Sequence, residues 1–206
     1  MDKPSKPLGR PRATKGDMPL NQKILMTAIP LFLSHGFDSV SMDDIAKECQ
    51  VTKASVYYYF PSKSDLLTAS MIQLMDNVRR VTIKRLSEPL PLRERLLNIT
   101  EGHLKAIDFD LHSFMRKMEA ILSDEQMKAM RKSEQGILDA LETEFQKSAD
   151  SGEIGPVDAR IIARAYTSLL MMGHAHDGNG NKMFPQESDA ATQIIDILWH
   201  GLYPPK

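Results

Sequence analysis

Three helix-start signals follow one another within residues 41–65, and they limit how this segment can fold. Each places a short hydroxyl side chain before a helical stretch, and two have an acid three residues later that can complete a capping box. The signals are Ser41-x-x-Asp44, Thr52 and Ser62-x-x-Asp65. Because they lie about ten residues apart, only short helices fit, over about 42–49 and 53–60. Two such helices joined by a tight turn form a helix-turn-helix, whose second helix can enter the major groove of DNA.

The rest of the chain also has helical periodicity, and no pair of alternating apolar runs is joined by a hairpin signal. We therefore expect an all-α fold. A first helix begins near Asn21 and ends at Gly36, although Pro30 lies inside it and predicts a kink. Six further helices are expected over about 63–86, 91–107, 112–122, 124–150, 157–176 and 187–202.

These helices predict two folded domains. The helix-turn-helix domain is expected over residues 20–67, and a larger six-helix domain is expected over residues 68–206. The long helix that begins near residue 63 starts in the first domain and runs into the second. It is therefore the natural mechanical link between the two.

Charge is distributed unevenly along the chain. Residues 1–63 carry 9 basic and 6 acidic side chains, a net charge of +3, whereas the rest of the chain carries 17 and 21, a net charge of −4. Residues 1–19 combine basic side chains with proline and glycine and cannot bury a core, so we expect a disordered basic arm. Within it, Gly9-Arg10-Pro11-Arg12 resembles the Arg-Pro core of AT-hook peptides, which implies that Arg10 and Arg12 enter a minor groove. A solubilising tail is the alternative.

Composition also limits the compartment and the covalent chemistry. No window approaches the roughly 18 consecutive apolar residues of a membrane span, and the first 19 residues lack the apolar core of a signal peptide. We therefore expect no membrane partner and a cytoplasmic location. The single cysteine, Cys49, excludes an internal disulfide framework and is expected to be a buried thiol.

Residues 45–67, IAKECQVTKASVYYYFPSKSDLL, resemble the DNA-binding signature of TetR-family transcriptional repressors. The resemblance begins near residue 20 and covers apolar, capping and aromatic positions in register across three helices. Two residues depart from the family pattern. Gln50 stands where the family usually turns on glycine, so we expect it to strain the turn, and Ala54 stands where glycine is frequent.

The resemblance implies DNA contacts for the residues that match. Those implied to bind phosphates are Ser41, Ser55, Tyr57, Tyr59 and Lys63, and those implied to meet base edges are Lys53, Ala54 and Tyr58. Chemistry agrees with this division, because hydroxyl donors reach backbone oxygens while a lysine in the first turn can meet guanine acceptors. An aromatic core is the alternative for the tyrosines, but three consecutive residues span about 300° of helix and cannot all be buried against one neighbour.

The resemblance further implies a homodimer that pairs through the last two helices and fits a palindromic operator. The apolar residues of these helices are Ile161, Ile162, Ala165, Leu169, Met172, Ala190, Ile194, Ile195, Leu198 and Leu202. Burial within one chain is the alternative for both faces. A pocket for a small-molecule effector, largely apolar, is implied for the larger domain, whose methionines suit adaptable binding as well as plain core packing. Candidate pocket residues are His103, Phe114, Met118, Tyr166 and Met171.

Sequence signals for metal or catalytic chemistry are weak. His174 and His176 point about 200° apart on a helix and are expected to be solvated. The acidic stretch 108–112 is expected to be solvated as well, and residues 177–181 begin like a calcium loop but lack its glycine, so we expect a flexible loop there. No phosphate-binding loop, nucleophile elbow or zinc-protease helix is present. We therefore expect no metal, no cofactor and no enzyme activity.

The predicted function is a ligand-responsive transcriptional repressor, a homodimer that binds double-stranded operator DNA and is released by a small-molecule effector. One alternative is a small helical enzyme that uses His103 or His112, although the sequence places no base or metal beside either. Another alternative is a ligand-independent architectural DNA-binding protein, which would leave the acidic larger domain without a role.

Overall fold

The computed structural model describes residues 18–106, 111–175, 177–179 and 181–202. The basic arm with Arg10 and Arg12, and the residues Asp108, Asp110 and His176, lie outside these ranges, and the side chain of His112 is not described. In the part of the chain that the structure describes, every regular element is an α-helix, which confirms the all-α prediction. The helices are α1 (Leu20–Ser39), α2 (Met42–Glu48), α3 (Lys53–Tyr59), α4 (Lys63–Leu86), α5 (Leu92–Ala106), α6 (Leu111–Met118), α7 (Asp124–Asp150), α8 (Ala159–Met172) and α9 (Glu187–Leu202).

Helix starts agree with the sequence where a serine or threonine side chain caps the helix. The predicted ranges of α4 and α7 are confirmed, and both helices begin at a serine that accepts a hydrogen bond from a backbone amide, Ser62 in α4 and Ser123 in α7. The predicted range of α6 was too long. The chain leaves the helix after Met118, and the Ile121 amide donates to the Met118 carbonyl. The prediction for α8 was also too long, because the helix ends at Gly173.

Helix α1 is interrupted at Gly36 and not at Pro30. Gly36 has φ 77° and ψ 165°, a conformation that glycine adopts without steric cost, and the last three residues of α1 follow it. The helix continues through Pro30 as predicted, because the proline ring lies on the exposed side and the backbone there keeps helical dihedrals; the kink at Pro30 stays a prediction. The hydroxyl of Ser34 donates to the Pro30 carbonyl at 2.5 Å, one turn further along.

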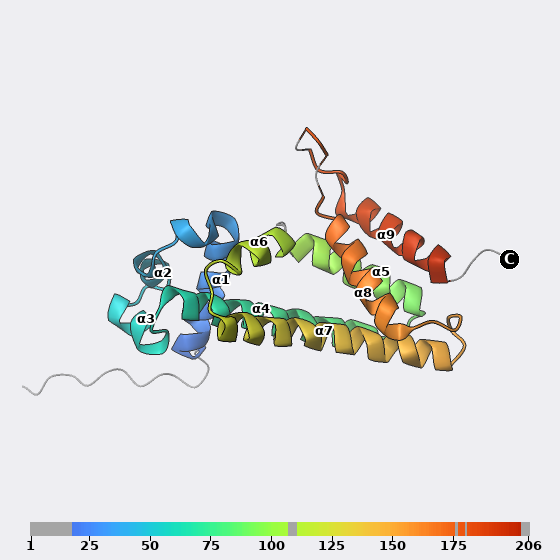
Figure 1. The fold of residues 1–206 in the computed structure, drawn as a ribbon, viewed down its shortest axis with the longest axis horizontal. Coiled ribbons are helices and arrows are strands. Elements are labelled where there is room, and N and C mark those ends of the chain that lie inside the picture. The colour runs from blue at the N-terminus through green and yellow to red at the C-terminus, as the bar shows by residue number, and fades with distance from the viewer. Residues whose placement is uncertain (1–17, 107–110, 176, 180, 203–206) are drawn as a thin grey trace, which may run out of the picture.

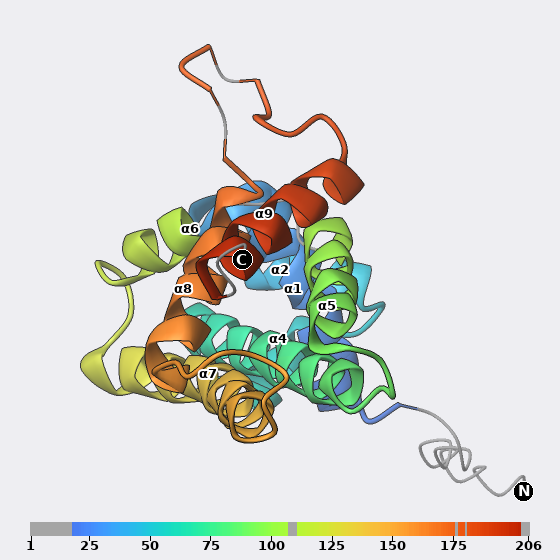
Figure 2. The ribbon, with the colours of Figure 1, turned by 90° about the vertical axis from the view of Figure 1, so that its right-hand side faces the viewer.

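Helices α4 and α7 lie side by side along the long axis of the molecule (Figure 1). The short helices α2 and α3 sit with α1 at one end, while α5, α8 and α9 pack together toward the other end (Figures 1 and 2). Helix α4 contacts α1 in the first group and α5 in the second. It therefore connects both ends of the molecule through one continuous helix, as the sequence predicts.

Two large groups of buried apolar side chains form the core. The first group joins α1 to α4 with α6 and the start of α7, and its last members are Phe114, Met118, Leu122, Met127 and Met130. The second group joins the end of α4 with α5, α7, α8 and α9 and includes Phe145 and Tyr166. The first core therefore extends past the predicted domain boundary at residue 67. None of the helices in the described ranges is both long and apolar enough to span a lipid bilayer.

Candidate DNA-binding surface and effector domain

Helix α2 begins with a complete capping box. The Ser41 hydroxyl accepts from the Asp44 amide at 3.1 Å, and the Asp44 carboxylate accepts from the Ser41 amide at 2.9 Å and from its hydroxyl at 2.6 Å. The hydrogen bonds from Ser41 lower the pKa of Asp44, so the carboxylate stays charged at the positive end of the helix dipole. The start of α2 is therefore held in one conformation.

Helix α3 is fixed by a cap at its start and by one buried residue. The Thr52 hydroxyl accepts from the Ser55 amide at 3.1 Å and lies 2.8 Å from the Ser55 hydroxyl. Val56 is fully buried in the first core. The opposite side of α3 is therefore the side that remains free to contact another molecule.

The turn between α2 and α3 requires a left-handed residue. Gln50 has φ 57°, and the Val51 amide donates to the Ala46 carbonyl at 2.9 Å across the turn. A side chain in this region is disfavoured by contact between its Cβ atom and the backbone, so the predicted strain at Gln50 is confirmed. The preceding residue, Cys49, is fully buried, as expected for a thiol on the inner face of α2.

The three tyrosines of α3 lie at the surface. Tyr58 is 81% exposed, and Tyr57 and Tyr59 are 42% and 40% exposed. The rings of Tyr58 and Tyr59 meet edge to face, with their centroids 5.1 Å apart. An aromatic core is therefore excluded, and the phenol groups can reach a partner.

Lys53 has an ion-pair partner that sequence reasoning missed. Its Nζ atom lies 2.8 Å from Oδ2 of Asp43 on α2, and the side chains are 56% and 49% exposed. The hydrogen bond from Lys53 to Asp43, strengthened by their opposite charges, raises the pKa of Lys53. The two residues are ten positions apart and belong to different helices, so no spacing rule for a single helix would pair them.

The remaining predicted DNA contacts lie around the same surface. Ser41 and Ala54 are exposed, and Ser55 is half-buried beneath its contact with Thr52. Lys63, at the start of α4, is half-buried, with its Nζ atom 4.2 Å from the centroid of the Phe37 ring. The structure thus brings together the predicted residues that lie in its described ranges, on α2, α3 and the first residue of α4.

A family model described as "Bacterial regulatory proteins, tetR family" matches residues 24–69, which contain this surface. Over these residues the chain is therefore similar to the DNA-binding domain of TetR-family regulators. One relative is IcaR of Staphylococcus aureus, a negative transcriptional regulator of the icaADBC biofilm operon, with 37% identity over 62 residues. That match covers 30% of this chain and 33% of IcaR, so the chain matches about a third of the length of this relative.

Two solved structures share the fold of this chain over most of its length. FadR of Bacillus subtilis in complex with stearoyl-CoA has a TM-score of 0.71 at 18% identity, covering 88% of this chain and 99% of FadR. AibR in complex with isovaleryl coenzyme A and operator DNA has a TM-score of 0.62 at 24% identity, covering 91% of this chain and all of AibR. At these identities the likeness shows the fold alone.

Three of the five predicted effector-pocket residues lie in the two cores. Phe114 and Met118 of α6 are buried in the first core, against the DNA-binding domain. Tyr166 of α8 is buried in the second core, where its hydroxyl lies 3.0 Å from that of Thr100. Burial raises the pKa of Tyr166, so its hydroxyl stays protonated. Met171 and His103 are half-buried, and neither belongs to these two cores.

His103 on α5 faces His174, which directly follows Gly173 at the end of α8. Their ring centroids are 5.8 Å apart, and Nε2 of each ring is buried. Burial and, to a smaller extent, His174 lower the pKa of His103 to about 4, so His103 is neutral at neutral pH. The interpretation of His174 as a solvated histidine was wrong, because its ring meets His103 on α5. The local sequence could not reveal this contact, since α5 lies about 70 residues earlier in the chain.

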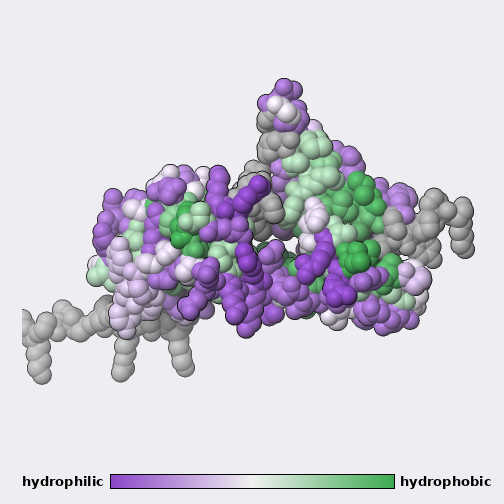
Figure 3. Space-filling view, viewed as in Figure 1, coloured by the Kyte–Doolittle hydropathy of each residue, from purple (hydrophilic) through white to green (hydrophobic). Residues whose placement is uncertain are grey.

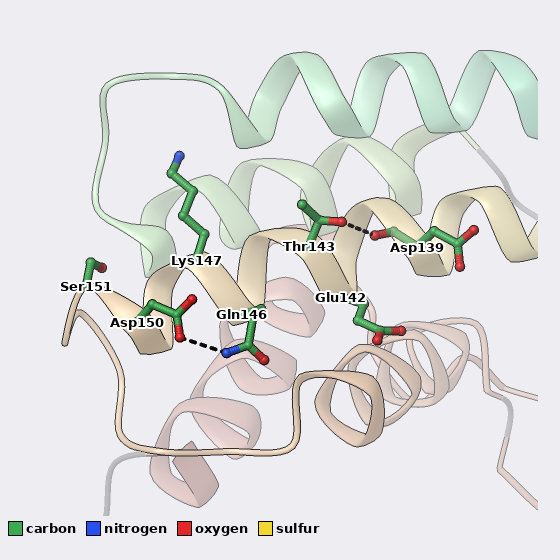
Figure 4. A pocket seen from close by; sticks show the side chains of 7 residues that line it. All are labelled: Asp139, Glu142, Thr143, Gln146, Lys147, Asp150 and Ser151. Atoms are coloured by element: carbon green, nitrogen blue, oxygen red, sulfur yellow. Dashed lines mark hydrogen bonds between the residues drawn. The ribbon is translucent and has the colours of Figure 1, made fainter.

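Other predicted polar positions serve the local fold. Oδ1 of Asp177 accepts from the amides of Asn179 and Asn181, at 2.8 and 2.9 Å, so this carboxylate closes its own loop. The described residues contain no group of three or more His, Cys, Asp or Glu side chains placed to hold a metal ion. A hollow along α7 is open and polar, with Gln146 donating to Asp150 at 2.8 Å (Figure 4). That hollow does not match an apolar effector.

The predicted dimer residues are partly buried within one protomer. Ala190, Ile194, Ile195 and Leu198 are buried inside the chain, so intramolecular packing is correct for this face of α9. Ile161 of α8 is instead 61% exposed, and Ile197 of α9, which was not among the predicted residues, is 52% exposed. Hydrophobic residues gather over α8 and α9 in the space-filling view (Figure 3). An apolar surface thus remains on these two helices.

Proposed function

We propose that this chain is a ligand-responsive transcriptional repressor that binds a palindromic operator as a homodimer. The exposed face of α3 carries the proposal, because three phenol groups and Lys53 project from a short helix whose other face is anchored by Val56. Phenol and ammonium donors are suited to phosphate oxygens and guanine edges in a major groove. The similarity of the domain to that of IcaR, a negative regulator, supports repression rather than activation.

The homodimer is supported by the apolar surface left on α8 and α9. Exposed isoleucines such as Ile161 and Ile197 are costly in water and are suited to a symmetric helix-to-helix interface. A two-fold axis through this interface would present two copies of α3 to two half-sites of an operator. The basic arm with Arg10 and Arg12 would then reach the minor groove beside each half-site.

Two connections are suited to carry an effector signal to the DNA-binding domain. Helix α4 is continuous from the first core to the second. The side-chain Nε2 atom of Gln126, at the start of α7, donates to the Asp65 carboxylate on α4 at 2.8 Å. A shift of α6 and α7 would therefore move the first core, to which Phe114 and Met118 belong.

The effector is proposed to be a small molecule with a largely apolar part, and acyl-coenzyme A thioesters, whose acyl chains are apolar, are the first class to test. The structures of FadR and AibR, which share the fold, hold stearoyl-CoA and isovaleryl coenzyme A. Among the predicted pocket residues, the half-buried pair His103 and Met171 is the better candidate, because Phe114, Met118 and Tyr166 are already packed in the cores. A neutral His103 would accept a hydrogen bond from the ligand.

The test selects bound fragments from the source genome with the full chain and measures operator affinity by fluorescence anisotropy, with and without a series of acyl-coenzyme A thioesters. An effector should lower operator affinity about 5–150-fold, and operator DNA should lower effector affinity by the same factor. If no fragment is enriched over random DNA, the proposed function is wrong. If the effector and the operator bind independently of each other, the larger domain does not control DNA binding.

A further inference from the structure

Asp43 and Lys53 connect the first turns of α2 and α3 on the proposed DNA-binding surface. The carboxylate and the ammonium group are 2.8 Å apart, and each side chain is about half exposed. Both helix starts are fixed, α2 by the Ser41 capping box and α3 by Thr52. The ion pair therefore joins two rigid points and remains accessible to a DNA duplex.

Asp43 limits the positions that the Lys53 ammonium group can occupy. A free lysine side chain has four rotatable bonds and samples a wide volume, whereas the aspartate side chain has only two and starts from a fixed helix turn. The contact also places the Lys53 ammonium 5.9 Å from the centroid of the Tyr57 ring. An ammonium group has three donor hydrogens, so two remain for a base edge after one is donated to Asp43.

The pair also changes how α3 responds to phosphate charge. An unpaired lysine is attracted to any phosphate, whatever the sequence, and releases a counterion when it binds. Lys53 in the ion pair is neutralised by Asp43 and gains less from a phosphate. Asp43 without Lys53 would instead place an uncompensated negative charge near the DNA. The pair thus lowers sequence-independent attraction at the position where Lys53 would read a base.

From this geometry we propose that Asp43 is a specificity-determining residue, which acts by holding the Lys53 ammonium group at one base pair and away from the phosphates. The inference rests on the proposed function, because it requires that α3 enters the major groove. It assigns Asp43 a positioning role, while Lys53 makes the contact with the base.

The substitution Asp43→Asn separates affinity from specificity. It removes one negative charge and frees Lys53, so affinity for random DNA should rise, and the log-affinity against log-salt slope should steepen by about 0.9 per protomer. Preference for the base pair that Lys53 reads, expected to be about 5–150-fold in the natural chain, should fall toward equality. Sequence selection and anisotropy across a salt series measure both quantities.

Glu48→Gln is the matched control, because Glu48 is an exposed carboxylate at the other end of the same helix. It should raise affinity for random DNA without changing the base preference. In a Lys53→Ala background, Asp43→Asn should have no further effect on base preference, because its action requires the ammonium group. Asp43→Glu should restore part of the preference, since it keeps the charge. Circular dichroism verifies that each variant is folded.

The outcomes distinguish this inference from the proposed function. If the natural chain selects an operator and Asp43→Asn selects the same bases with the same ratios, the positioning role is wrong and the proposed function stands. If Asp43→Asn still changes base preference in the Lys53→Ala background, Asp43 reads the base directly, which also overturns the inference. If the natural chain selects no sequence, the proposed function itself has failed.

Discussion

Two groups of charged side chains lie toward opposite ends of α4 and differ in their surroundings. At the helix-turn-helix end, Asp43 and Lys53 form one exposed ion pair. At the other end, the buried guanidinium of Arg95 on α5 donates to the Leu86 carbonyl and contacts the carboxylates of Glu144 and Glu153. Glu153 in turn accepts from the Leu92 amide at 2.5 Å.

This difference shows which polar contacts are part of the fold and which can exchange. The Arg95 cluster joins α4, α5 and α7, and removing one member would leave charges buried without partners. The exposed pair contributes little to folding, because water and salt can replace either partner. Its ammonium group therefore remains accessible to a base edge while the carboxylate holds it in place, whereas the charged groups of the buried cluster are closed to any outside partner.

The strongest test of this contrast removes the buried cation. Arg95→Ala should lower the free energy of unfolding by about 3–5 kcal/mol, because Glu144 and Glu153 lose the charge that compensates them. Urea unfolding followed by Trp199 fluorescence measures the loss. Arg93→Ala is the matched control on the same helix, since Arg93 pairs with Asp196 at a half-exposed position and should cost under about 1 kcal/mol. Equal losses for the two variants would contradict the contrast.

Acid should reveal a second buried polar site. The pKa of His103 is about 4 in the folded chain against 6.5 in the unfolded chain, so the unfolded state binds a proton first as the pH falls. Burial of neutral His103 should therefore carry no penalty above pH 6.5, and the free energy of unfolding should be about 2 kcal/mol lower at pH 5 because of this residue. The variant His103→Asn should remove this loss, and His200→Asn, at an exposed position on α9, should retain it. The readout is urea unfolding at pH 7 and pH 5.

A single buried hydroxyl gives a smaller effect. The Thr100 and Tyr166 hydroxyls lie 3.0 Å apart, and both reach the Leu96 carbonyl, at 2.8 and 3.4 Å, so the Tyr166 hydroxyl belongs to a buried hydrogen-bond network. Tyr166→Phe should then cost about 1 kcal/mol of stability, the net value of one hydrogen bond. Tyr58→Phe removes the same atom from an 81% exposed side chain and should leave the unfolding midpoint unchanged. A loss for Tyr58→Phe as large as that for Tyr166→Phe would contradict this assignment.

Sequence alone predicted those parts of the structure that depend on local chemistry. Serine caps set the starts of α4 and α7. Three consecutive tyrosines cannot share one buried face, so the exposed surface of α3 was predictable as well. The end of α6 was not, because residues 119–122 suit a helix, yet the chain turns there and buries Leu122 in the first core.

The missed partners all depend on tertiary contacts. Asp43 reaches Lys53 across the turn between two helices, and His103 meets His174 only because α5 packs near the end of α8. The pocket prediction relied on residue types, and methionine or phenylalanine at helical spacing suits a core as well as a ligand site. Phe114 and Met118 accordingly lie in the first core.

The smallest expected effect is at the turn of the DNA-binding domain and has the opposite sign. Gln50 is held at φ 57°, where a side chain costs about 1–2 kcal/mol, and glycine would remove that cost while adding freedom to the unfolded chain. Gln50→Gly should therefore raise the free energy of unfolding by about 0.5–1 kcal/mol. Gln50→Ala should give no gain, because its Cβ atom meets the same backbone, and Glu48→Gly should lose stability, because it places glycine inside α2.

Urea unfolding of the three variants and of the natural chain measures these differences in the free energy of unfolding. An equal gain for Gln50→Gly and Gln50→Ala would show that the left-handed backbone is not the source of the strain. A gain for glycine alone would show that this polar, exposed end of the molecule retains a conformational cost that the family's usual glycine avoids.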